Sequence, residues 1–266
     1  MSKTTHYTSG LPRACSTLLQ NLLAQNPLVH ATATSGLHEI LYISKGFFKT
    51  EEFRTFPNPA TGEQIFMDFM RAGISSAYDN ITDRPVVVDK SRSWIGSATL
   101  LFKLFPNAKL LVPVRDIRGV LSSMEKKFQT HPEFQLEMTQ QDTGLIQTVE
   151  GRVQFWLSGA PVGLAIQRVH ELARVHKDKV MFVHAEKLTQ SPQATMDAVW
   201  SYLGMDPVQH DVDNVTQYTQ EHELGWPYGD HNVKPTVAPL RADWYDTLGK
   251  QLSETINQKF NWITNL

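Results

Sequence analysis

A short loop near the amino terminus carries residue types that bind phosphate-like anions. It spans residues 10–18 and reads GLPRACSTL. The residues before it alternate as in a strand, and the leucines after it repeat at helical spacing. Gly10 permits a tight turn, while Ser16 and Thr17 stand where a helix begins, with free backbone N–H groups and the positive end of the helix dipole. With the fixed charge of Arg13 beside them, these features predict an anion site.

The phosphate loop of nucleotide kinases, G-x-x-x-x-G-K-[ST], fits this sequence poorly. Counted from Gly10, Cys15 stands at the second glycine, and Ser16 stands at the lysine that holds the β- and γ-phosphates. Asp89 is the one carboxylate that invites comparison with a Mg²⁺ ligand of such an enzyme. A P-loop kinase therefore remains an alternative that lacks its characteristic lysine.

Further cations follow two other predicted strands. Lys90 ends the β-branched run at 84–90, and Arg115 follows the apolar run at 109–114. On the next predicted helix, Ser123 and Lys127 are four residues apart and share a face. Because parallel strands place ligands at their carboxyl ends, we expect Arg115, Ser123 and Lys127 to converge on one anion.

Two residues that can accept a proton follow the second predicted strand, at 28–34. These are His38 and Glu39, and either type serves as a general base in enzymes. For either residue alone, a polar position at the start of a helix is the ordinary explanation. The pair is therefore a candidate base whose role the residues alone do not decide.

The elements that must position these residues alternate along the chain. Predicted strands cover 4–9, 28–34, 84–90, 109–114 and 179–184, and helical patterns cover 64–78, 148–175, 193–202 and 242–260, with a kink at 159–161 in the second of these. Such alternation predicts an α/β fold in which a central parallel sheet of about five strands is flanked by helices.

The composition sets limits on the kind of protein. The chain has 266 residues and a formal net charge of −2, which offers no general basic field for nucleic acid. Its single cysteine, Cys15, cannot form an intrachain disulfide. No apolar run approaches the roughly 20 residues that cross a bilayer, and there is little room for a leader before the first strand. The histidines are scattered along the sequence and form no pattern typical of metal ligands. We expect one soluble, cytoplasmic domain over 1–266 that needs no metal.

Four blocks of sequence together resemble the sulfotransferases that use 3′-phosphoadenosine 5′-phosphosulfate (PAPS). The blocks are the loop at 10–18, the segment VDKSR at 88–92, the segment LFPNAK…VRDIR…SM within 104–124, and the segment FVHAEKL at 182–188. The first is similar to the family's phosphosulfate loop, although Ala14-Cys15 replaces Ser-Gly. Within the family the cofactor motifs look nearest to the tyrosylprotein branch, with Val233-Lys234-Pro235 as its late element.

The resemblance implies a P-loop-like three-layer fold and a role for each matching position. The 5′-phosphosulfate would be held by the residues of the loop: Arg13, Ala14, Cys15, Ser16, Thr17 and Leu18. The 3′-phosphate would be held by Arg115, Ser123 and Lys127, and Lys234 would add a contact from a lid at about 225–241. Arg13 and Lys90 would neutralise charge on the bridging oxygen and the sulfonate as the bond between them breaks, and the product would be 3′,5′-adenosine bisphosphate (PAP).

The resemblance also implies a base and an acceptor, and here alternatives remain. The tyrosylprotein branch has a catalytic glutamate after its second strand; Glu39 matches it best, and His38 is its rival because the spacing from the loop is longer here. The acceptor would be a hydroxyl on a small molecule or a peptide, bound by segments 36–84 and 129–178. A catalytically degenerate nucleotide-binding module is the non-enzyme alternative, and homodimerisation is left open.

Overall fold

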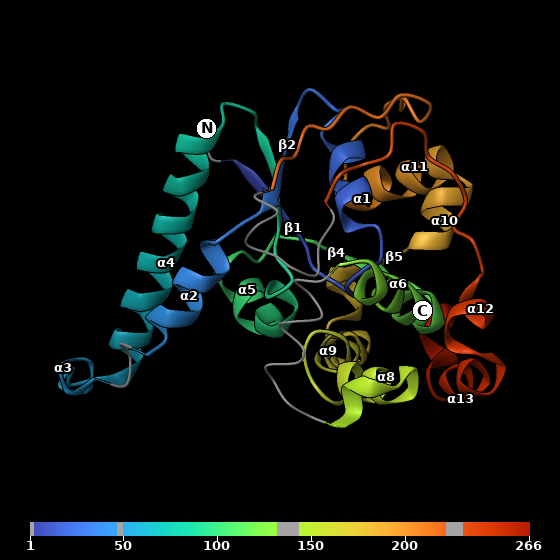
Figure 1. Cartoon of the computed structure of the whole chain (residues 1–266). Coiled ribbons are helices and arrows are strands. Elements are labelled where there is room, and N and C mark those ends of the chain that lie inside the picture. The colour runs from blue at the N-terminus through green and yellow to red at the C-terminus, as the bar shows by residue number, and fades with distance from the viewer. Residues whose placement is uncertain (1–2, 47–49, 132–143, 222–230) are drawn as a thin grey trace.

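A central sheet of five parallel strands organises the computed structural model, which describes residues 3–46, 50–131, 144–221 and 231–266 (Figure 1). The strand order is β2-β3-β1-β4-β5, and every neighbouring pair is parallel. The strands are β1 (Thr4–Thr8), β2 (Val29–Thr34), β3 (Val86–Lys90), β4 (Leu110–Val114) and β5 (Val180–His184). This confirms the predicted fold class, and it brings the carboxyl ends of all five strands to one edge.

Helices cover both faces of this sheet (Figure 1). In the first half of the chain they are α1 (Ser16–Leu23), α2 (Leu37–Ser44), α3 (Glu51–Arg54), α4 (Pro59–Ile81), α5 (Ala98–Leu104) and α6 (Ile117–Thr130). In the second half they are α8 (Val149–Ser158), α9 (Val162–Val175), α10 (Ala185–Gln190), α11 (Pro192–Leu203), α12 (Trp244–Leu248) and α13 (Lys250–Phe260). Short 3₁₀ turns lie at Trp94–Ser97, Gly144–Gln147, Lys177–Lys179 and Asn261–Asn265. None of the helices in the described part of the chain is long and apolar enough to cross a membrane.

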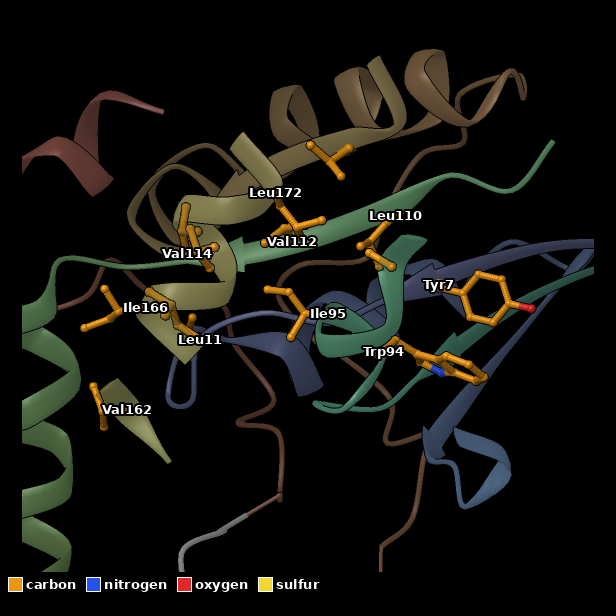
Figure 2. Close-up of a cluster of buried hydrophobic side chains, with 14 of the residues drawn as sticks. Tyr7, Leu11, Trp94, Ile95, Leu110, Val112, Val114, Val162, Ile166 and Leu172 are labelled. Carbon is orange, nitrogen blue, oxygen red and sulfur yellow. The ribbon is translucent and has the colours of Figure 1, made fainter. Parts of the chain in front are cut away.

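Alternation along the strands divides the apolar side chains between two cores. Leu110 and Val112 of β4 enter the core that also contains Ile166 and Leu172 of α9, and Figure 2 shows these residues within one cluster. Leu111, between them in the sequence, enters the opposite core with side chains of α1 and α11. Because both faces are covered, the strands read as continuous apolar runs, as parallel strands do.

Three helical segments differ in extent from the sequence prediction. Helix α4 begins at Pro59, earlier than the predicted 64, because the side chain of Asn58 caps it and proline suits the first helical position. The predicted helix at 148–175 is two helices, α8 and α9, because Gly159 and Pro161 interrupt the pattern. The predicted helix at 242–260 is also two, broken at Gly249, where φ is 77°.

Three predicted segments lie partly outside the described residues. Of the acceptor segments at 36–84 and 129–178, residues 47–49 and 132–143 fall there, and of the lid at 225–241, residues 225–230 fall there. The described part of that lid, from residue 231 onward, lies against the segment at 212–215. Backbone hydrogen bonds from Val215 to Pro235 and from Val237 to Val212, 2.6 and 2.8 Å long, hold the two together.

Candidate anion-binding site

The loop after β1 has a backbone that only certain residues tolerate. Leu11 N–H donates to the carbonyl of Pro113 at 2.9 Å, which draws the loop against β4. A Cβ on Gly10 would lie 2.3 Å from that same carbonyl oxygen, so glycine is required there. Arg13 and Cys15 both adopt the left-handed region, with φ of 58° and 60°. Cys15 is the N-cap of α1 and occupies the place of the family's glycine in a conformation that glycine adopts without strain.

A cavity of about 750 Å³ opens at this loop. Its lining contains every cofactor-binding residue that the sequence predicted, together with Lys90: Arg13, Ala14, Cys15, Ser16, Thr17, Leu18, Lys90, Arg115, Ser123, Lys127 and Lys234. Over the described residues, the lining holds eight lysines and arginines and a single carboxylate, that of Asp243. A chain with a net charge of −2 thus concentrates positive charge in one hollow, which suits a polyanionic ligand.

Hydrogen bonds join the loop to the strand and helix that follow it in space. Nε of Arg13 donates to Oγ of Ser123 at 3.0 Å, and Nη1 of Arg115 donates to the carbonyl of Arg13 at 2.9 Å. Residues more than 100 positions apart in the chain are thereby fixed beside one another. Arg115, Ser123 and Lys127, which we expected to converge on one anion, all line this cavity. Their binding of an anion stays a prediction.

Gly119 makes room for Arg115 on helix α6. A Cβ at position 119 would lie 2.8 Å from Nε of Arg115 and 3.2 Å from its Cζ. The neighbouring Asp116 has a structural task, because it caps α6 through the N–H of Arg118 and pairs with that side chain at 2.6 Å. The motif R-D-x-R therefore gives one arginine to the cavity and uses Asp116 and Arg118 to hold the helix start.

The catalytic candidate Lys90 sits at the end of β3 between the ends of two other strands. Its Cα pairs with Thr8 of β1 and with Thr34 of β2. Its ammonium contacts Oε1 of Glu221, and both side chains are almost completely buried. Glu221 had no place in the sequence prediction, since nothing along the chain links it to a lysine 131 residues away.

The two candidate bases, His38 and Glu39, lie in the first turn of helix α2 and not in the described cavity lining. Nδ1 of His38 is 3.3 Å from a carboxylate oxygen of Glu39, and its Nε2 is 3.0 Å from Oγ of Ser97. Burial lowers the pKa of His38 despite the neighbouring carboxylate. Neither residue belongs to the described lining of the cavity. Their role as base stays a prediction.

Asp89, the carboxylate that a kinase would need for Mg²⁺, is buried in the core and hydrogen-bonded there. Its carboxylate accepts hydrogen bonds from the hydroxyl of Tyr78 at 2.9 Å and from the indole N–H of Trp94 at 2.7 Å. The residue is fully buried, and burial raises its pKa. Across the described residues, no group of three or more His, Cys, Asp or Glu could hold a metal ion. The kinase alternative thus loses its metal ligand as well as its lysine.

Several cavity residues were not predicted as part of the site. The ionisable ones are Arg92, Lys126, His231, Arg241 and Asp243. Lys126 pairs with Asp243 at 2.6 Å, which ties helix α6 to the start of α12. Two features of the sequence could have pointed to members of this set. Lys126 directly precedes the predicted site residue Lys127, and Arg241 is a cation at the end of the proline-containing segment predicted as a lid.

Comparison with known proteins decides the family. A model described as "Sulfotransferase family" matches residues 8–210. The chain belongs to the sulfotransferase family. This match runs from the end of β1 through the end of α11 and into the segment after it.

A similar protein of Drosophila melanogaster agrees with the assignment of this chain to the sulfotransferase family. The chain is 26% identical over 214 residues to a protein-tyrosine sulfotransferase of Drosophila melanogaster, covering 77% of this chain and 39% of that protein. The chain thus matches well under half the length of that relative.

Solved structures show the same fold. A mouse sulfotransferase complexed with PAP superimposes with a TM-score of 0.54 at 10% identity, covering 99% of this chain and 85% of that one. The sulfotransferase domain of the Synechococcus PCC 7002 olefin synthase gives 0.51 at 17% identity, covering 98% and 95%.

Proposed function

We propose that this sulfotransferase moves a sulfonate group from PAPS to a hydroxyl acceptor. The observation that carries the proposal is the cavity at the loop after β1, where eight cationic side chains converge beside the start of α1. PAPS carries a 3′-phosphate and a 5′-phosphosulfate, and a hollow lined by several cationic side chains suits such a polyanionic molecule. The mouse protein of the same fold was solved with PAP, which supports this choice of nucleotide.

The loop would hold the 5′-phosphosulfate. Helix α1 begins at Ser16, so the first N–H groups of the helix have no partner within it and point toward the loop. The hydroxyls of Ser16 and Thr17 and the charge of Arg13 line the same cavity. Oxyanions are bound well by such a combination of backbone N–H groups, dipole and arginine.

Helix α6 and the arginine that precedes it would hold the 3′-phosphate. Arg115 reaches the cavity past Gly119, and Ser123 is tied to Arg13. Lys127 lies one turn further along the helix, and Lys234 lines the cavity from the carboxyl-terminal segment. Arginine, hydroxyl and ammonium donors around one anion provide charge-assisted hydrogen bonds.

Bound PAPS supplies the activated sulfonate and a phosphate leaving group. Arg13 and Lys90 would stabilise negative charge at the bond that breaks, as cations do in phosphoryl transfer. The proton of the acceptor hydroxyl would pass to a carboxylate or histidine base, for which His38 and Glu39 are the sequence candidates. The acceptor itself would lie against segments 36–84 and 129–178. That use of the segments, operation without a metal and a cytoplasmic location remain predictions, and homodimerisation stays open.

An acceptor screen tests this activity. Radiolabelled PAPS would be incubated with the protein and with phenols, a tyrosine-containing peptide, aliphatic alcohols and saccharides in turn. We expect label to move to at least one acceptor class, and we expect Lys90→Ala to lose that transfer while it keeps PAP binding. Binding of PAP without transfer to any class would favour the catalytically degenerate module.

A further inference from the structure

A buried ion pair connects the catalytic candidate Lys90 to the far end of the chain. The ammonium of Lys90 contacts Oε1 of Glu221, and the two side chains are 7% and 3% exposed. Lys90 lines the cavity, whereas Glu221 approaches it from the segment that follows helix α11. A cation that faces a proposed anion site is therefore already held by an anion of the chain itself.

The same carboxylate is held from two other directions. Oγ1 of Thr34, at the end of β2, donates to Oε2 of Glu221 at 2.7 Å. Nε2 of His231 lies 3.4 Å from that oxygen. Both carboxylate oxygens thus have partners, which lie at the ends of two strands and in the carboxyl-terminal segment.

Helix α1 determines where Glu221 lies. The side-chain oxygen of Asn21 accepts hydrogen bonds from the backbone N–H groups of Tyr218 and Thr219 at 2.6 and 3.0 Å, and its amide donates to Oγ1 of Thr219 at 3.0 Å. Asn21 is fully buried. Because these contacts fix the chain two residues before Glu221, the carboxylate is positioned by the helix that begins at the phosphosulfate loop.

The charges of the pair depend on one another. Burial pushes the pKa of Glu221 upward, but Lys90, Thr34 and His231 together bring that pKa below its ordinary value, so the carboxylate is ionised. A buried ammonium is tolerated when an anion compensates it, and either a carboxylate or a sulfonate can do so.

We propose that Glu221 is a positioning residue that holds Lys90 in the unliganded protein and competes with the sulfonate of PAPS for its ammonium. The inference rests on the proposed function, because it needs a sulfonate to enter the cavity. When PAPS is bound, Lys90 turns from the carboxylate to the sulfonate, and the lysine is available for transfer only after that exchange. PAP lacks the sulfonate and leaves the pair largely as it is.

Calorimetric titration of PAPS and of PAP, without acceptor, into wild type, Glu221→Gln and Glu221→Asp tests the exchange. Glutamine keeps the shape and removes the competing charge, so we expect the Kd of PAPS to fall roughly tenfold in Glu221→Gln while the Kd of PAP changes far less. Glu221→Asp keeps the charge and is expected to stay near wild type. Glu254→Gln makes the same change at a carboxylate whose hydrogen bond from Tyr245 is exposed, and it serves as the control, with no change in either Kd.

The outcomes separate this inference from the proposed function. If wild type binds neither nucleotide, the proposed function fails and the inference fails with it. If wild type binds both but Glu221→Gln leaves the ratio of the two Kd values unchanged, or weakens PAPS, only the competition is overturned. Thermal unfolding of each variant, with and without PAP, shows that the compared proteins are folded.

Discussion

Nε of Arg13 donates a hydrogen bond to Oγ of Ser123 at 3.0 Å, which links the loop after β1 to the middle of helix α6. The two residues come from the two motifs that would bind opposite ends of the nucleotide. Their contact would fix the distance between the residues proposed for the phosphosulfate and those proposed for the 3′-phosphate. Preorganisation of this kind lowers the cost of binding.

Loss of the Ser123 hydroxyl is expected to weaken nucleotide binding. Ser123→Ala removes a donor to the 3′-phosphate and releases the side chain of Arg13, so the Kd of PAP should rise about tenfold. Calorimetry measures it directly. Ser76→Ala on the exposed side of α4 is the control and should leave the Kd unchanged. An unaltered Kd in Ser123→Ala would remove Ser123 from the site.

A methyl group at Gly119 should displace Arg115. The Cβ of Gly119→Ala would lie 2.8 Å from Nε of that arginine, so the guanidinium must move, and we expect PAP to bind roughly tenfold more weakly. Gly73→Ala in α4 is the matched control, because its Cβ meets nothing within 4 Å. That variant should gain about 0.5–1 kcal/mol in the free energy of unfolding from helix propensity and keep its PAP affinity. Equal PAP affinity in the two variants would contradict the placement of Arg115.

Cys15 is expected to cost stability in the loop. Its φ of 60° is strained for a residue with a side chain, so Cys15→Gly should raise the free energy of unfolding by about 1 kcal/mol. Cys15→Ser keeps the strain and should not. Chemical denaturation compares the two variants. If glycine stabilises no more than serine, the left-handed backbone at this position is not a source of strain.

His6 should make the fold less stable in mild acid. Burial, with Lys109 nearby, lowers its pKa from 6.5 to about 4. The unfolded chain therefore binds a proton between those two values that the folded chain does not, and stability falls as the pH drops from 6.5 toward 4, by up to about 3 kcal/mol.

Substitution of His6 tests how much of this acid-dependent loss of unfolding free energy comes from His6. Its Nδ1 accepts a hydrogen bond from the N–H of Lys109 at 3.2 Å, which asparagine can also accept. His6→Asn should therefore weaken the dependence of the unfolding free energy on pH between pH 4 and 6.5. Denaturant titration at several pH values measures this dependence. An unchanged slope would show that His6 is not the group responsible.

Sequence patterns predicted those parts of the site that depend on strand ends and helix faces. Lys90 and Arg115 directly follow apolar strands, and Ser123 and Lys127 share a helical face, so the parallel sheet and the period of the helix were enough to bring them to one cavity. The five strands were predicted for the same reason, since buried parallel strands are continuous apolar runs.

Features that depend on contacts between distant segments were not predictable in this way. Glu221 meets Lys90 because Asn21 fixes the intervening chain, and no local pattern records that contact. The role of Gly119 depends on the path of the Arg115 side chain. Breaks within helical patterns, as at Gly249, were missed because the apolar spacing continues across them.

Competitive calorimetry tests most directly whether the cavity binds the adenosine bisphosphate part of PAPS. PAP and ATP with Mg²⁺ would be titrated into wild type and into Arg115→Ala. We predict that PAP binds with a Kd of about micromolar or below, that ATP binds far more weakly, and that Arg115→Ala loses at least about tenfold in PAP affinity. Preference for ATP with Mg²⁺, or PAP binding that ignores Arg115, would contradict the account.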